Sequence, residues 1–101
     1  MSTANLSDPD LRRLLVRAAT GDVEAFLDFY DATCAVTWRL ELCRHGHADR
    51  AKDAVTRRYV GAWLHAAAQA RSGLSARAWL LSLSPDLMPP LAWDDVARVG
   101  A

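Results

Sequence analysis

Apolar residues recur at helical spacing along most of this chain, and glycine and proline interrupt the pattern between successive segments. Leu11, Leu14, Leu15 and Ala18 stand at positions i, i+3, i+4 and i+7, which places them on one face of a helix. No segment shows the alternation of apolar and polar residues that is typical of a half-buried strand. The sequence therefore predicts an all-α protein.

Capping signals indicate where the first two helices begin and end. Asp8 reads as an N-cap, with Pro9 at the first helical position. Gly21 is expected to end this helix, because glycine readily adopts the left-handed conformation found after helices. Asp22 can cap the second helix, which should stop near Gly46. Its buried side is expected to consist of Phe26, Phe29, Tyr30, Thr33, Val36 and Leu40.

Two further helices are expected in the second half of the chain. Asp49 can cap the third, and a turn over residues 71–74 follows it. Ser75 can cap the fourth, which should run from residue 76 to about residue 83 and end near Ser84, because Pro85 disfavours helical geometry before it. The buried stripe of the third helix is expected to consist of Ala51, Val55, Tyr59, Ala62, Trp63 and Ala66.

These helices indicate one small domain, since the chain has only 101 residues. We expect a three- to four-helix bundle over residues 1–84 and a proline-rich tail over residues 85–101. The tail has room for one more short helix, from Trp93 to Val99. Trp93 either folds back on the bundle or anchors a partner.

The composition favours a cytoplasmic protein with no membrane contact. No apolar run approaches the roughly 20 residues that a membrane span needs, and the N-terminus lacks the order of a signal peptide. Cys34 and Cys43 are therefore expected to be thiols rather than a disulfide.

Charge is unevenly distributed although the net charge is zero. Residues 1–43 hold four basic and seven acidic residues, a net charge of −3. Residues 44–77 hold seven basic and two acidic residues, a net charge of +5, and residues 78–101 hold one basic and three acidic residues, a net charge of −2. A basic centre between acidic ends indicates either a face for nucleic acid or an acidic protein, or a solvated helix surface.

No catalytic signature occurs in the sequence, so we expect neither an enzyme nor a small-molecule substrate nor a cofactor. A glycine-rich phosphate loop and a His-Glu-x-x-His motif are both absent. Cys43, His45 and His47 are the residue types that bind zinc, but a fourth ligand is missing nearby, and Cys34 falls on the opposite side of the helix. The alternative is a helix C-terminus that carries cationic side chains and is followed by a polar loop.

The stretch from Ala51 to Trp63 resembles the core-polymerase-binding helix in region 2 of sigma factors of the extracytoplasmic-function class. That family typically reads Ala-Glu-Asp, then Gln-Glu, Phe-Leu and Ala-Trp, with Ala-Trp-Leu later. The positions with matching spacing are Ala51, Asp53, Tyr59, Ala62, Trp63 and Ala78 to Leu81. Shorter matches extend the resemblance to about residues 11–83; they are Leu14, Leu15, Ala18, Gly21, Asp22, Ala25, Phe26, Phe29 and Tyr30.

The resemblance implies a partner-binding face on the third helix, formed by Lys52, Asp53, Thr56, Arg57 and Arg58. In the family this face docks on a basic coiled coil of the largest polymerase subunit. The family's first Glu and its Gln-Glu pair are replaced here by Lys, Thr and Arg. A reversed charge opposes docking on a basic partner. If Arg57 and Arg58 form a functional face, changing both to Glu should abolish a partner interaction without unfolding the domain.

The resemblance also implies a promoter-reading segment at the fourth helix and the turn before it. Here Arg71 and Arg77 flank the turn, and Trp79 offers a ring on which an unpaired base can stack. The fourth helix is expected to be cut short by Pro85, and no second domain is expected after a linker. A complete initiation factor is therefore not expected.

Two function classes remain open, beside a decayed gene product without a selected role. The first is a transcription-related accessory protein that binds RNA polymerase core or promoter DNA. The second is a protein-interaction module that sequesters an anti-sigma factor or pairs with a sigma factor or another regulator, without DNA binding.

Overall fold

The computed structural model describes residues 6–83, and every regular element within that range is a helix. The elements are α1 (Asp8–Ala19), α2 (Val23–His45), α3 (Ala48–Leu64), the 3₁₀ helix η2 (Ala66–Arg71) and α4 (Ala76–Ser82). The predicted all-α bundle is therefore confirmed. None of these helices is long and apolar enough to cross a bilayer. The tail with the predicted Trp93–Val99 helix lies outside the described residues.

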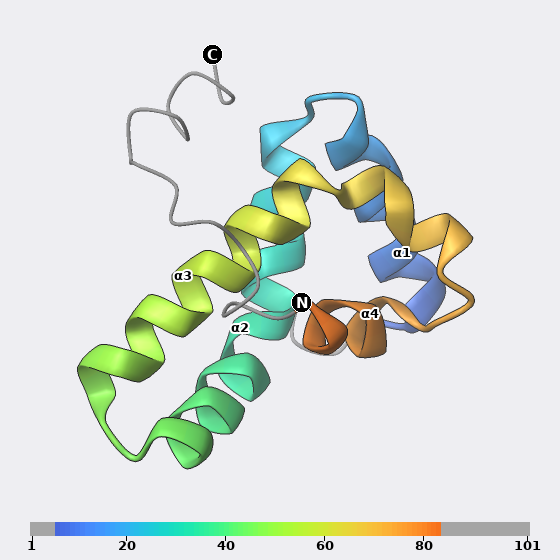
Figure 1. Cartoon of the computed structure of the whole chain (residues 1–101). Coiled ribbons are helices and arrows are strands. Elements are labelled where there is room, and N and C mark those ends of the chain that lie inside the picture. The colour runs from blue at the N-terminus through green and yellow to red at the C-terminus, as the bar shows by residue number, and fades with distance from the viewer. Residues whose placement is uncertain (1–5, 84–101) are drawn as a thin grey trace.

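The two longest helices, α2 and α3, lie side by side and antiparallel, and α1, η2 and α4 gather on one side of that pair (Figure 1). α1 contacts α2, α3, η2 and α4, so the first helix links all the others. The core between them contains Leu11, Leu15, Ala18, Phe29, Ala32, Val55, Tyr59, Ala62, Ala66, Ala76, Trp79 and Leu80.

Glycines end the first two helices as predicted, and two of the expected caps are confirmed. Gly46 has φ +64° and donates its N–H to the Leu42 carbonyl, 2.8 Å away, which ends α2. The Asp22 carboxylate accepts the N–H of Ala25 at the start of α2. Ser75 caps α4 in the same way, accepting the N–H of Ala78.

Two other predicted caps are wrong by one or two residues. Ser7, not Asp8, caps α1, and its hydroxyl accepts the N–H of Asp10. This frees the Asp8 carboxylate to accept the N–H of Ala76 at 2.7 Å, so it joins the start of α1 to the start of α4. His47 rather than Asp49 caps α3: its Nδ1 accepts the N–H of Asp49.

The buried side of α2 differs from the prediction at several positions. Tyr30, Val36 and Leu40 were expected to be buried but are 38%, 53% and 37% exposed, whereas Thr37 and Glu41 are buried. The buried residues follow a spacing of four, and such a line drifts around a helix that has 3.6 residues per turn. The buried residues of α2 are Ala25, Phe29, Ala32, Thr33, Thr37 and Glu41.

The end of α3 also differs, because the chain turns into η2 where continued helix or turn was expected. α3 stops at Leu64 with His65 as C-cap, and Ala66 is buried from η2. No glycine or proline marks this change in the sequence. The fourth helix ends at Ser82, two residues before the position that Pro85 predicted.

Candidate protein-binding face of helix α3

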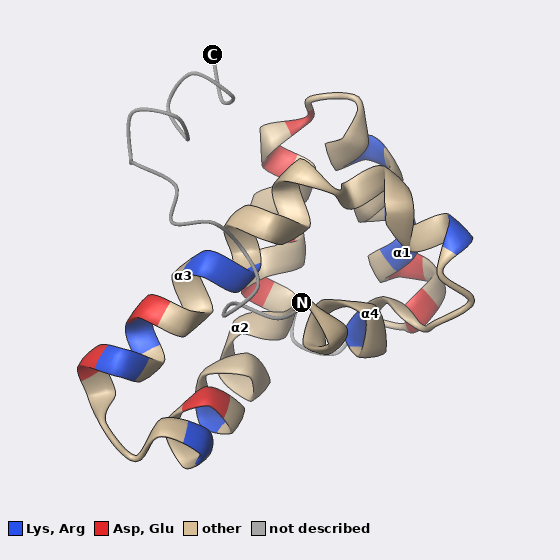
Figure 2. Ribbon diagram, viewed as in Figure 1, with Lys and Arg blue, Asp and Glu red and all other residues tan. Residues whose placement is uncertain are grey.

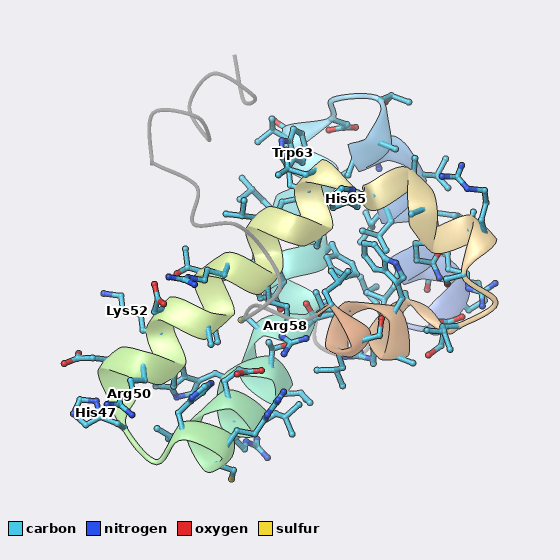
Figure 3. All side chains as sticks on the ribbon, in the orientation of Figure 1. His47, Arg50, Lys52, Arg58, Trp63 and His65 are labelled. Carbon is cyan, nitrogen blue, oxygen red and sulfur yellow. The ribbon has the colours of Figure 1, made fainter. Side chains whose placement is uncertain are left out.

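Four of the five residues predicted to bind a partner share the outer side of α3. Lys52 and Asp53 are exposed, and Thr56 and Arg57 are partly exposed. Figure 3 shows Lys52 projecting away from the bundle, near the turn that joins α2 to α3. The face points outward because the opposite side of the helix is buried; that side consists of Ala51, Ala54, Val55, Arg58, Tyr59, Gly61 and Ala62.

An ion pair orders this face. Arg57 Nε lies 3.1 Å from Asp53 Oδ2, one helical turn away, with side chains 40% and 63% exposed. Exposed pairs at this spacing contribute roughly 0.3–0.5 kcal/mol, so the pair orients the two side chains more than it stabilises the fold. The Thr56 hydroxyl donates to the Lys52 carbonyl at 2.9 Å. Lys52 has no ion-pair partner among residues 6–83, so the face presents this cation beside a partly neutralised pair.

Charged residues occur in α3 only from Asp49 to Arg58 (Figure 2). Each acidic residue is followed by two basic ones along the chain, and the last part of the helix, from Tyr59 to Leu64, carries no charge. The charged part of the face therefore lies toward the turn that connects α2 to α3.

Arg58 was predicted to lie on this face, and its predicted exposure is wrong, since only 1% of the residue is exposed. Its Nη2 lies 2.5 Å from Glu41 Oε1, and Glu41 is itself fully buried. Its Nη1 donates to the carbonyls of Leu80 and Leu81, at 2.9 Å each, and to that of Leu83. Figure 3 shows Arg58 directed inward, toward α4.

The Arg58 side chain thus caps the C-terminal end of α4 by donating to its last carbonyls. The last carbonyls of a helix have no partner within the helix and carry a partial negative charge, so a guanidinium there is doubly favourable. Glu41 supplies the counter-charge, and its Oε2 lies 3.1 Å from His45 Nε2. Within residues 6–83, Arg58 Nε is the one buried side-chain nitrogen or oxygen without a partner. This cluster fixes α4 to both α2 and α3.

Tyr59, the neighbour of Arg58, anchors a second buried polar contact. Its hydroxyl lies 2.6 Å from Thr33 Oγ1 and 3.2 Å from Thr37 Oγ1. Burial raises the pKa of Tyr59 above its ordinary value, although both hydroxyl contacts act in the opposite direction. Because the folded pKa exceeds the unfolded value, the contribution of Tyr59 to stability is complete below pH 10 and falls as the pH rises through the folded pKa.

The residues predicted to contact nucleic acid do not share one accessible face. Arg71 is exposed at the end of η2, but Arg77 is partly buried, with its Nη1 3.5 Å from the Ala32 carbonyl. Trp79 is only 4% exposed and belongs to the core. A base cannot stack on this ring unless α4 moves, so Trp79 does not serve as a stacking platform in this conformation.

The suggested zinc ligands have other roles here. His47 caps α3, His45 contacts Glu41, and Cys43 is an exposed thiol. Residues 6–83 contain no group of three or more His, Cys, Asp or Glu side chains placed to hold a metal ion.

Sequence reasoning missed Glu41 and Thr37 as buried residues. A signal was present, because Thr33, Thr37 and Glu41 follow Phe29 at successive spacings of four. Charged residues are rarely buried unless paired, so the spacing alone does not predict that Glu41 lies in the core.

Comparison with known proteins assigns no family: no family model, no curated protein and no solved structure matches the chain. The resemblance to sigma factor region 2 therefore rests on the residues quoted above and stays a prediction.

Proposed function

We propose that this protein is a transcription-related accessory protein that acts by binding another protein through the outer face of α3. One observation supports this proposal above others. The residues that the resemblance relates to polymerase binding, Lys52, Asp53 and Arg57 among them, share an accessible face, whereas Trp79, the residue expected to stack on a base, is buried.

The charges on the α3 face indicate which class of protein can bind there. A basic coiled coil of polymerase would meet Lys52 and Arg57, and like charges at an interface oppose binding. Asp53 is the residue that the resemblance relates to this basic coiled coil, and its carboxylate is already paired with Arg57 at 3.1 Å. An anti-sigma or sigma protein with an acidic contact surface suits this face better than the polymerase core does.

Binding to promoter DNA is the second candidate, favoured by the seven basic against two acidic residues of segment 44–77. Phosphate contacts weaken steeply as salt concentration rises. A DNA affinity that falls steeply with salt, and falls further in an Arg71→Ala variant, would support this candidate over protein binding.

Affinity capture from a native lysate, followed by mass spectrometry, tests the proposal. The decisive bait is a charge-swapped variant, Asp53→Arg with Arg57→Asp, which retains an internal ion pair but inverts the face. We expect this variant to lose a partner that the wild-type chain captures. A matched swap on α1, Asp10→Arg with Arg13→Asp, exchanges another exposed pair and should retain the partner. If all three baits capture the same proteins, the α3 face is not the binding site.

A second variant separates the partner classes. Thr56→Gln with Arg57→Glu restores the Gln-Glu pair of the resembled family. Increased binding to purified core polymerase would indicate that the polymerase site has been weakened but not displaced. Loss of the lysate partner without any gain of polymerase would indicate a different protein partner.

A further inference from the structure

A row of apolar side chains lies accessible along the first half of α2, away from the α3 face. Val23, Leu27 and Tyr30 are 46%, 54% and 38% exposed, and Cys34 continues the row as a half-buried residue. Their successive spacings are four, three and four residues, which is the spacing of a seam that packs against another helix. We call these four residues the α2 strip.

Acidic side chains border the α2 strip on one side. Glu24, Asp28 and Asp31 are all exposed, and none of them forms an ion pair with any residue in the described range 6–83. By contrast, Asp8, Asp10, Asp22 and Asp53 each contact an arginine. The three carboxylates beside the strip are therefore available to cations from outside this part of the molecule.

The opposite side of the strip is occupied by α3. The ring centroids of Tyr30 and Tyr59 are 4.7 Å apart, and those of Phe26 and Trp63 are 5.3 Å apart. Figure 3 shows Trp63 at the end of α3, beside the first turns of α2. Among the residues that the structure describes, the strip therefore has α3 on one side and the acidic side chains on the other.

We propose that the α2 strip docks an amphipathic α-helix of another protein, with lysine or arginine beside its apolar face. Apolar side chains of that helix would cover Leu27 and Tyr30, and its cations would meet Asp28 and Asp31. A second copy of this chain fits less well. An antiparallel pair of α2 helices would set the acidic border of one copy against that of the other, and like charges there oppose association.

A display library of amphipathic helices, each about 18 residues or five turns long, tests this proposal. All members carry apolar residues at the four-three spacing, and the flanking positions vary among lysine, arginine, glutamate and serine. Selection on the wild-type chain should enrich helices with basic flanks. Their affinity should fall about tenfold or more, equivalent to about 1.4 kcal/mol, with Leu27→Asp and with Asp28→Lys combined with Asp31→Lys.

Two matched controls distinguish a loss at the α2 strip from a change elsewhere on the surface. Val36→Asp changes another exposed apolar residue of α2, 53% accessible, and should leave binding unchanged. The α3 charge swap should also leave it unchanged, so the two proposed surfaces succeed or fail separately. Circular dichroism checks that each variant is folded.

Four results would overturn the proposal. The first is enrichment without preference for flank charge, and the second is no enrichment over a Leu27→Asp bait. The third is an equal loss of binding in Val36→Asp. The fourth is a concentration-dependent dimer in sedimentation that Leu27→Asp abolishes, since this would assign the strip to a second copy of the chain.

Discussion

Arg58 and Glu41 form an ion pair in the interior, where neither charge is hydrated. Both residues are fully buried or nearly so, and their closest atoms are 2.5 Å apart. Removing two charges from water is expensive, and a buried pair compensates only when additional hydrogen bonds satisfy its remaining groups. The carbonyls at the end of α4 and the His45 ring supply those contacts. The pair therefore helps to hold α4 against α2 and α3, and a single substitution should disrupt it.

We predict that Arg58→Ala destabilises the protein by about 3–5 kcal/mol, because it leaves Glu41 as a buried charge without its partner. It also leaves the last carbonyls of α4 without a donor. Arg57→Ala, one residue earlier and partly exposed, is the matched control and should change stability by less than about 0.5 kcal/mol. Urea denaturation followed by circular dichroism measures both free energies of unfolding.

A double variant separates the two roles of Arg58. Arg58→Met with Glu41→Leu removes both charges, so it should be more stable than Arg58→Ala. It should not reach the wild-type stability, because no donor then reaches the α4 carbonyls. If Arg58→Ala proves as mild as Arg57→Ala, the ion pair and the α4 contact do not hold the fold together.

The same pair shows why residue-level reasoning placed Arg58 on the surface. Arg58 stands four residues from both Ala54 and Ala62, so periodicity alone assigns it to the buried stripe. Its charge argued the other way, because arginine is rarely buried unless paired. The partner that resolves this conflict, Glu41, lies 17 residues earlier on another helix. Such a contact depends on how α2 and α3 pack, which no local pattern specifies.

At the scale of elements, the sequence predicted where each α-helix lies but not every boundary. Asp22, Gly46 and Ser75 act as predicted. At the starts of α1 and α3, a second polar residue precedes the predicted cap, and the earlier residue, Ser7 or His47, takes the position. η2 was missed because short 3₁₀ turns depend on packing more than on residue type.

The cap of α2 yields a prediction about pH. The N–H of Ala25 and the guanidinium of Arg17 both lower the pKa of Asp22 from its ordinary 3.8. Because the folded pKa is depressed, the stabilisation by Asp22 is present above pH 3.8 and is lost as the pH falls through the folded pKa. Asp22→Ala should therefore lower the melting temperature at pH 7, and the difference from wild type should shrink in acid.

Asp22→Asn is the control for this prediction. Asparagine still accepts a hydrogen bond as an N-cap but carries no charge, so it should retain most of the stability at pH 7 and lose the pH dependence. Thermal unfolding of the three proteins between pH 2 and pH 7 measures the effect. A difference between wild type and Asp22→Ala that stays constant across this range would exclude a role for the carboxylate charge.

At the scale of the whole molecule, the basic excess of segment 44–77 shrinks once the fold is known. Arg58 is in the core, Arg57 is paired with Asp53, and Arg44 lies 3.7 Å from Glu41. The sequence sums charges along the chain, whereas a partner meets only those that reach the surface without a counter-ion. The sequence therefore predicted four residues of α3 that prove accessible, but not the burial of Arg58 or the net charge of the face.

The last prediction concerns initiation. The 101-residue chain alone should not direct promoter-specific transcription by core polymerase. Two requirements are affected at once in the described region. Docking lacks the family's Gln-Glu pair, since Thr56 bonds its own helix and Arg57 reverses a charge, and base reading lacks an accessible ring, since Trp79 is 4% exposed. Docking losses of a few kcal/mol would lower affinity by about a hundredfold or more.

A run-off assay with purified core enzyme and a set of promoters measures this, with a full-length sigma factor as the positive control. Even if the variant Thr56→Gln with Arg57→Glu gains affinity for the core enzyme, it should produce no specific transcripts, because it leaves Trp79 in the core. Specific transcripts from the wild-type chain would overturn the prediction. They would mean that the substitutions on α3 change which partner surface and promoter are recognised, and that α4 opens on the enzyme to expose the residues it buries in the free protein.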